Sequence, residues 1–236
     1  MRWNRIVILF VLGGLLTGLV LLGKEAMRDG TAEKPKPNIV LTGTTQTAEG
    51  WSKAEQWAKS VVRLEVYDNH GDRIATGSGF AALDERFLIT ARHVVVNMEY
   101  MTATRDDGSS FRIDRVLAAD ADSDIAICAL PEDAGLTTLA FAEETPPRGT
   151  KVVVIGSQFG VINLVTEGIV SGTWSADNVT RIFFTAPVSG GSSGGPLLTS
   201  AGTVVGIVTG TYEKGQNLNI AAANEAAHKL CESIID

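Results

Sequence analysis

The sequence predicts an all-β domain, either an antiparallel sandwich or a pair of barrels, preceded by an apolar N-terminal segment. From residue 61 onward, short runs of β-branched and apolar residues alternate with turns rich in Gly, Asn and Asp. Runs of this length and spacing, with little helical pattern between them, are typical of all-β sandwiches and barrels. The chain has 236 residues, 44% of them hydrophobic and 20% charged. About 180 residues outside the N-terminal part are enough for one domain with its own core.

The N-terminal part contains an uncharged apolar run at residues 6–22. About 17 apolar residues is at the short end of what spans a bilayer, but it exceeds the apolar part of most cleaved signal peptides. Lys24 stands where signal cleavage prefers a small residue. Residues 1–23 are therefore predicted to form a membrane anchor, and a cleaved signal peptide is the alternative.

The residues around and within this run predict its orientation and one form of self-association. Arg2 and Arg5 precede the run, which favours a cytoplasmic N-terminus and a periplasmic or extracellular main domain. Gly14 and Gly18 form a G-x-x-x-G pair, which allows two such helices to pack closely. A single-pass membrane protein is expected, and a homo-oligomer is left open.

The other elements follow in chain order. Residues 24–50 are polar and interrupted by prolines, so they are predicted to form a flexible linker. The folded domain occupies residues 51–236 and begins with a short predicted helix at residues 52–59, where Ser52 and Glu55 form a capping box. Strands are predicted at residues 61–67, 74–83, 87–90, 125–130, 151–155, 169–171, 181–185 and 204–208, and a helix at residues 224–235.

Charge and cysteine content exclude one class of partner and leave one question open. The formal net charge is −7 and the pI is about 5.0, with no cluster of Lys and Arg, so nucleic acid is not expected as a partner. Cys128 and Cys231 could form one disulfide in an exported chain, or they could be two buried small hydrophobic residues.

Only three histidines are available for any mechanism that uses an imidazole. His70 lies in a polar turn and His228 in the terminal helix, where solvation or packing explains them. His93 follows the apolar run at residues 87–90, and the end of a strand is a place where a rigid scaffold presents a side chain to a cleft. His93 is the catalytic candidate, although its position alone is also compatible with a structural role.

A second candidate element is the Gly- and Ser-rich segment at residues 189–196. A flexible hairpin loop is one interpretation. The other is an oxyanion hole, which needs two backbone N–H groups aimed at one point. Glycines allow the left-handed conformations and the close approach of substrate that such a turn requires. A serine at its centre, Ser193, would then be the nucleophile.

The third candidate is the acidic segment at residues 120–124, which precedes the predicted strand at residues 125–130. Asp120 and Asp122 are expected to be solvated. Asp124 leads directly into the strand, where its carboxylate could lie partly buried beside an imidazole. In that position a carboxylate fixes the tautomer of the imidazole and stabilises its protonated form.

Together these segments resemble the trypsin-like serine proteases, and especially the Deg (high-temperature-requirement) group. The candidates occur in the order His, Asp, Ser, which is the order of the chymotrypsin-type triad. The likeness extends from about residue 61 to residue 224. Six segments carry it, with the group's pattern in parentheses: residues 89–95 (TAxHV), 120–126 (DxxxDIA), 191–196 (GNSGGP, with Ser192 in place of Asn), 77–80 (GSGF), 154–160 (AIGNPFG) and 165–171 (VTSGIVS).

The resemblance implies a fold and a function. It implies two six-stranded antiparallel β-barrels with the active site between them. It assigns His93, Asp124 and Ser193 to a catalytic triad, and the N–H groups of Gly191 and Ser193 to the oxyanion hole. The implied function is a serine endopeptidase that cleaves exported or misfolded proteins, or a specific partner, without a metal or organic cofactor. A catalytically silent pseudoprotease that binds peptides in the same cleft is the alternative.

The resemblance also implies where a substrate binds. Two short segments are expected to border the S1 pocket, and no carboxylate occurs in them, so a small to medium uncharged P1 residue is expected rather than Arg or Lys. Members of the Deg group usually carry a PDZ module after the protease domain, and none is expected here. The predicted pocket residues are Pro187, Val188, Ser189, Thr209, Gly210 and Thr211.

Overall fold

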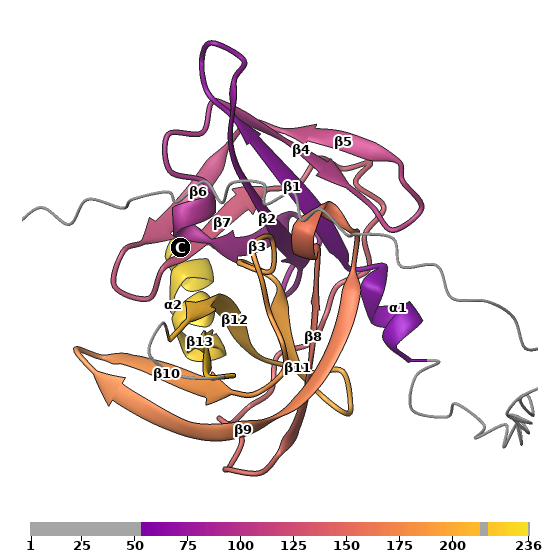
Figure 1. The fold of residues 1–236 in the computed structure, drawn as a ribbon. Helices are drawn as coiled ribbons and strands as arrows, with labels where there is room; N and C mark the ends of the chain where they lie inside the picture. Colours follow the sequence, from indigo (N-terminus) through magenta and orange to yellow (C-terminus); the bar gives the residue numbers. More distant parts are fainter. Residues whose placement is uncertain (1–52, 213–216, 236) are drawn as a thin grey trace, which may run out of the picture. The chain divides into compact units, whose positions relative to one another are not determined.

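The computed structural model describes residues 53–212 and 217–235 (Figure 1). The predicted anchor at residues 6–22, the linker at residues 24–50 and the capping residue Ser52 lie outside the described residues. Within the described part of the chain, no helix has both the length and the apolar character needed to cross a bilayer.

A seven-stranded antiparallel sheet forms the N-terminal half of the described domain, in the order β5-β4-β1-β2-β3-β7-β6. Side chains alternate between buried and partly exposed along β1, as expected for a strand with one face on a core. The strands are β1 (Val61–Tyr67), β2 (Arg73–Ala81), β3 (Phe87–Ala91), β4 (Tyr100–Thr104), β5 (Ser110–Ile113), β6 (Val116–Asp120) and β7 (Ile125–Ala129).

This half differs from the predicted six-stranded barrel. The chain between residues 110 and 120 is divided at residues 114–115 into β5, which pairs with β4, and β6, which pairs with β7. A single strand across residues 110–120 could have closed a barrel. Instead, β5 and β6 are two edge strands at opposite ends of the sheet.

The C-terminal half is a closed six-stranded barrel, as predicted, in the order β10-β13-β12-β11-β8-β9. Gly-containing turns and β-bulges in β10, β11 and β12 give the curvature that closure requires. The strands are β8 (Lys151–Gly156), β9 (Leu164–Ala176), β10 (Val179–Phe184), β11 (Pro196–Thr199), β12 (Val204–Thr211) and β13 (Asn219–Ala223).

Two helices flank the strands (Figure 1). The first, α1 (Ala54–Ala58), is shorter than predicted, and Lys53 at its N-cap makes no side-chain capping bond. The second, α2 (Asn224–Ile235), has the predicted bounds. Its first residue, Asn224, donates from Nδ2 to the carbonyls of Ala142 and Val204, which fixes the start of α2 against the barrel.

The apolar core has three parts. One cluster lies within the N-terminal sheet and another within the barrel. A third combines side chains of both halves with α2, for example Phe80, Ile155 and Ala227. The two halves therefore share one apolar interface, which α2 completes. Cys128 and Cys231 are both buried free thiols in different clusters, so the disulfide alternative is wrong.

Candidate active site

His93 and Asp124 form a close pair at one end of the N-terminal sheet. His93 lies in the short 3-10 helix η1 (Arg92–Val94), directly after β3, and Asp124 lies directly before β7. Because β3 and β7 are neighbours paired through Ala91 and Ile125, the end of one strand faces the start of the other. The His93 Nδ1 atom of the ring lies 2.6 Å from Asp124 Oδ2. The backbone N–H of His93 donates to Asp124 Oδ1 at 2.9 Å.

This pairing leaves the far side of the imidazole open. Both oxygens of Asp124 are engaged by His93, one at the ring and one at the backbone, so the carboxylate sets the ring orientation. The His93 and Asp124 side chains are 48% and 30% exposed, so a substrate can reach the ring. A carboxylate at Nδ1 favours the tautomer that carries the proton there, which leaves Nε2 as an acceptor.

The backbone before β7 is shaped to present Asp124. Asp124 has a φ of 59°, which is uncommon for a residue other than Gly, and its carbonyl accepts from the Arg92 N–H at 2.9 Å. Asp120 closes the preceding turn, where it accepts from the Ser123 N–H at 2.9 Å and from the Ser123 hydroxyl. That hydroxyl bond is the main cause that lowers the pKa of the Asp120 carboxyl. The prediction that Asp120 is simply solvated is therefore wrong.

The loop that carries Ser193 is fixed by hydrogen bonds rather than loose. Every carbonyl from residue 190 to residue 193 accepts a hydrogen bond, and the glycines expected to make the loop flexible take part in these contacts. The donors are the Phe159 N–H to Gly190 (2.9 Å), Ser78 Oγ to Gly191 (2.7 Å), the Gly195 N–H to Ser192 (3.0 Å) and the Ser78 N–H to Ser193 (2.8 Å).

Three backbone N–H groups of this loop, those of the exposed Gly190, of Gly191 and of Ser193, have no acceptor within the described residues. The N–H of Ser192 donates to Ser189 O at 2.9 Å, and that of Gly194 donates to Val208 O at 2.7 Å. The N–H groups of Gly191 and Ser193 make no such bond to any residue in 53–212 or 217–235. Since C=O and N–H of a trans peptide point in opposite directions, the bonded carbonyls of residues 190 and 192 fix where these N–H groups point.

Two glycines of the loop occupy positions that no other residue fits. Gly191 has a φ of +99°, and a Cβ there would lie 2.1 Å from the Ser157 carbonyl oxygen. Gly194 has a φ of +85°, and a Cβ there would lie 2.2 Å from both Ser78 O and Thr90 Oγ1. The Gly residues on either side of Ser193 are thus required by close backbone approach.

The structure brings the Ser193 loop beside the strand that leads to His93. Gly194 packs against Thr90 and Ala91, just before η1. Gly77 of β2 lies between the Val94 side chain and the Ser193 carbonyl. A Cβ at Gly77 would lie 2.8 Å from the Val94 side chain and 3.0 Å from the Ser193 carbonyl oxygen. Among the described residues, no hydrogen bond joins the His93 ring to the Ser193 hydroxyl.

The segments predicted to border S1 are also brought together, through a residue that the sequence analysis did not select. Asn219, which is buried, lies opposite Thr211 in the β12–β13 ladder and donates from Nδ2 to Ala186 O at 2.7 Å. The next carbonyl, that of Pro187, accepts from Thr166 Oγ1 at 2.8 Å. Asn219 follows residues without strand pattern, so nothing in the sequence marked it.

Ser78 and Thr90 are two further site residues whose contribution could not be derived from sequence. Both are fully buried polar residues in the N-terminal sheet, and the Thr90 hydroxyl donates to Ser78 O at 2.7 Å. Each lies in a segment that carries the family resemblance, and this resemblance was the one sequence signal that could have pointed to them. Their contacts with residues 191–194 depend on tertiary structure and could not be predicted.

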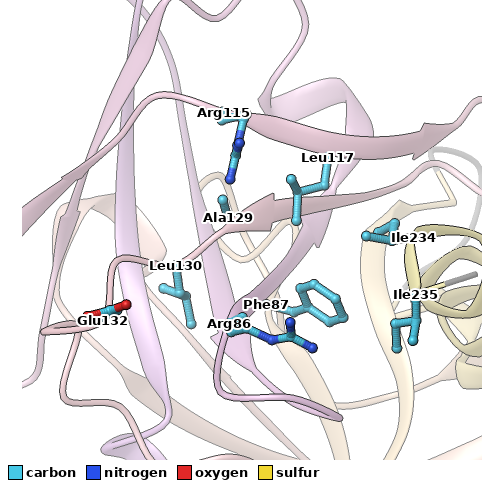
Figure 2. A pocket seen from close by; sticks show the side chains of 9 residues that line it. All are labelled: Arg86, Phe87, Arg115, Leu117, Ala129, Leu130, Glu132, Ile234 and Ile235. Atoms are coloured by element: carbon cyan, nitrogen blue, oxygen red, sulfur yellow. The ribbon is translucent and has the colours of Figure 1, made fainter.

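Hollows of the described residues also occur away from these side chains. One of them has a volume of about 430 Å³ and lies between β3, β7 and the end of α2. Arg86, Phe87, Arg115 and Ile234 are among its lining residues (Figure 2). Its lining contains none of the predicted site residues. The described residues also hold no cluster of three or more His, Cys, Asp or Glu that could bind a metal ion.

Comparison with protein families and curated proteins shows which family the chain resembles. A family model described as "Trypsin-like peptidase domain" matches residues 77–207. The chain is 31% identical over 170 residues to "Probable periplasmic serine endoprotease DegP-like" of Rhizobium meliloti, an alignment covering 69% of this chain and 33% of that protein. It is 36% identical over 171 residues to "Serine protease HTRA1" of Xenopus laevis, covering 66% and 37%. The chain thus spans about a third of the length of these relatives.

Solved structures show the same fold. A "serine endoprotease from Yersinia pestis" matches with a TM-score of 0.70 and 24% identity over 78% of this chain and 66% of that one, which bears on the fold alone. An "HtrA-type protease AlgW with tripeptide" matches with a TM-score of 0.69 and 25% identity over 79% and 64%. The predicted likeness to the Deg group is confirmed.

Proposed function

Because the chain belongs to the trypsin-like peptidase family, as a Deg/HtrA-like member, we propose that it is a serine endopeptidase with His93, Asp124 and Ser193 as its triad. One observation carries the proposal. An imidazole held by a carboxylate at 2.6 Å lies beside a serine loop in which the N–H groups of Gly191 and Ser193 have no acceptor within the described residues. A loop that served only as a connection would have no reason to order two such donors around one serine.

In the proposed reaction, Ser193 Oγ attacks the carbonyl carbon of the scissile peptide and its proton passes to His93 Nε2. The tetrahedral oxyanion is bound by the N–H groups of Gly191 and Ser193. His93 then gives its proton to the leaving amine as the C–N bond breaks. A water attacks the acyl-enzyme, its proton passes to His93, and Ser193 is restored. Asp124 orients His93 throughout.

The oxyanion hole supplies a large part of the expected rate. Removing one donor of such a hole lowers kcat by about 100- to 1000-fold in related enzymes. The missing hydrogen bond between His93 and Ser193 does not argue against the triad, since catalytic hydrogen bonds are often long before substrate binds.

Exported or misfolded proteins, or a specific partner, are the proposed substrates, with a small to medium uncharged P1 residue. The proposed S1 border consists of Pro187, Val188 and Ser189 on one side and Thr209, Gly210 and Thr211 on the other, linked through Asn219. None of these side chains offers a negative charge to Arg or Lys. A peptide-library digest checks this, and cuts mainly after Arg or Lys would contradict it.

Fluorophosphonate labelling is the experiment that tests the proposed function. The full-length chain and its Ser193→Ala variant are incubated with the probe and the labelled residue is identified by peptide mapping. We expect covalent labelling of the wild type at Ser193 and none of the variant, because only an activated serine displaces fluoride from the probe.

The same assay separates the alternatives. A folded wild-type protein that is not labelled but still binds peptides would be a pseudoprotease. A protein that does neither would make the Gly- and Ser-rich loop a simple connection. Labelling at a serine other than Ser193 would reject the assignment of the nucleophile.

We also propose that residues 1–23 anchor the protease domain outside the cytoplasm. The apolar run at residues 6–22 supports this, and a relative named as periplasmic agrees with an exported domain. The full-length chain should stay with membranes during an alkaline wash, whereas a chain lacking residues 1–23 should be released. A mature N-terminus beyond residue 23 would favour the cleaved signal peptide instead.

A further inference from the structure

We propose that Ser78 is a positioning residue for the oxyanion hole, acting across the interface between the N-terminal sheet and the barrel. The inference rests on the proposed function, and it assigns a role to a side chain that touches neither substrate nor the reacting atoms. Ser78 lies in β2, on the sheet that carries His93 and Asp124, and it is fully buried.

The hydroxyl of Ser78 makes two hydrogen bonds, both to the barrel half. It donates to Gly191 O at 2.7 Å and accepts from the Ser157 N–H at 2.9 Å. Ser157 follows β8, so the hydroxyl joins the end of a barrel strand to the loop before β11. With one donor proton committed to Gly191, the hydroxyl cannot rotate without losing that bond.

The backbone of Ser78 contacts Ser193, the second of the two residues proposed to bind the oxyanion. Its N–H donates to Ser193 O at 2.8 Å, and its carbonyl accepts from Thr90 Oγ1 at 2.7 Å. Ser78 therefore binds the carbonyls of Gly191 and Ser193, the two residues whose N–H groups are proposed to bind the oxyanion. One buried residue thus anchors the carbonyl side of both residues that carry the proposed donors.

Loss of the hydroxyl should affect the transition state more than the ground state. Without it, the Gly191 carbonyl has no partner, so Gly191 is held only through the Gly190 carbonyl on its other side. The position of the Gly191 N–H relative to the oxyanion is then less well fixed. His93 and Asp124 keep their own contacts, which do not involve Ser78. Ser78 makes no hydrogen bond to the residues of the proposed S1 border among the described residues.

The experiment compares Ser78→Ala with Ser60→Ala in the full-length chain. Ser60 is the control, because this serine is also buried and its hydroxyl pairs with Thr137 Oγ1 at 2.8 Å, away from the proposed site. For Ser78→Ala we expect kcat and the rate of fluorophosphonate labelling to fall at least about 10-fold, with KM within about twofold and the shape of the pH profile unchanged. Ser60→Ala should stay within about twofold of wild type in all of these.

Each outcome decides between the claims. Equal kcat in wild type and Ser78→Ala, or equal losses in both variants, would overturn the role of Ser78 while leaving the proposed function intact. A rise in KM with unchanged kcat would also overturn it. A wild type that neither cleaves nor labels would reject the proposed function and this inference with it.

A second variant covers the case in which Ser78→Ala does not fold. Ser78→Cys fills similar space with a much weaker hydrogen-bond donor. Its kcat should fall by several-fold or more at an unchanged melting temperature. A kcat equal to that of wild type would show that the strength of the bond to Gly191 does not matter, and would overturn the proposal.

Discussion

Asp120 stabilises the turn before Asp124 through hydrogen bonds to Ser123. The negative charge of its carboxylate strengthens these hydrogen bonds. Its carboxylate accepts from the N–H and the hydroxyl of Ser123, and the hydroxyl bond is the main cause that lowers the pKa of the Asp120 carboxyl. Hydrogen bonds to an ionised acceptor are about twice as strong as neutral ones. The turn is therefore expected to weaken when Asp120 is protonated.

The Asp120→Asn variant should lower the free energy of unfolding by about 1 kcal/mol at pH 7, since the site is partly exposed. The folded-state pKa of Asp120 is below its unfolded value, so its stabilisation is present above about pH 4 and lost as the pH falls further. The difference between variant and wild type should thus shrink below about pH 4. Urea unfolding from pH 3 to pH 7 measures it.

Asp122→Asn is the matched control for this prediction. Asp122 is exposed in the same turn, and only its backbone groups take part in the hydrogen bonds of the described residues. Its replacement should change the free energy of unfolding by less than about 0.5 kcal/mol at every pH. A difference for Asp120→Asn that persists at pH 3 would mean that packing, not charge, holds the turn.

At the scale of elements, β9 and the S1 border meet at Gly168. A Cβ there would lie 2.1 Å from the Ala186 N atom, directly before Pro187. Gly168→Ala should therefore push the S1 border outward, lowering the free energy of unfolding by about 1–3 kcal/mol and raising KM. Thermal unfolding and peptide kinetics measure the two effects.

Gly172 in the same strand offers the control. The nearest atom to a Cβ at Gly172 is Arg148 Nε at 3.7 Å, an ordinary contact with a flexible side chain. Gly172→Ala should leave KM and stability close to those of wild type. If the two variants behaved alike, the effect would belong to β9 as a strand and not to its contact with Ala186.

The strands that the sequence predicted are those in which local pattern and tertiary environment agree. Residues 61–67 alternate apolar and polar side chains and form β1 with those bounds. Five strands, β4, β5, β6, β11 and β13, were not predicted, and the last three lack that agreement. β13 (Asn219–Ala223) and β6 (Val116–Asp120) are rich in Ala, which has little β propensity, and β11 begins at Pro196. Their neighbours in the sheets, not their own residues, make them strands.

The same reasoning separates the parts of the candidate site. Chain order and motifs directed attention to His93, Asp124 and Ser193, because the residue types themselves carry the chemistry. Ser78 and Asn219 act through contacts with residues more than 30 positions away in the chain. Such contacts exist only in the folded chain, so no local pattern could reveal them.

At the scale of the whole molecule, the shared cluster makes the two halves and α2 one apolar unit. Phe80 and Ile127 of the sheet, Ile155 and Leu198 of the barrel and Cys231 of α2 all belong to it. Separation of the halves would expose this cluster to water. We therefore expect the described domain to unfold in a single cooperative step, with α2 leaving only when the interface opens.

The two thiols test this expectation without any substitution. Burial raises the pKa of Cys128 to about 12 and that of Cys231 to about 11, so neither is a reactive thiolate in the folded protein at pH 8. Cys128 lies within the cluster of the N-terminal sheet and Cys231 within the shared cluster. Modification by a thiol reagent therefore reports the opening of each region separately.

With labelling followed by peptide mapping across a urea series, both cysteines should react at rates that agree within about twofold. The rates are first divided by those of the fully denatured chain, which removes any difference in intrinsic reactivity. Modification of Cys231 about tenfold faster than Cys128 at low urea would mean that α2 detaches while the sheet stays folded. The interface between the halves would then be open before global unfolding, and Ser78 could not hold the serine loop as rigidly as its contacts imply.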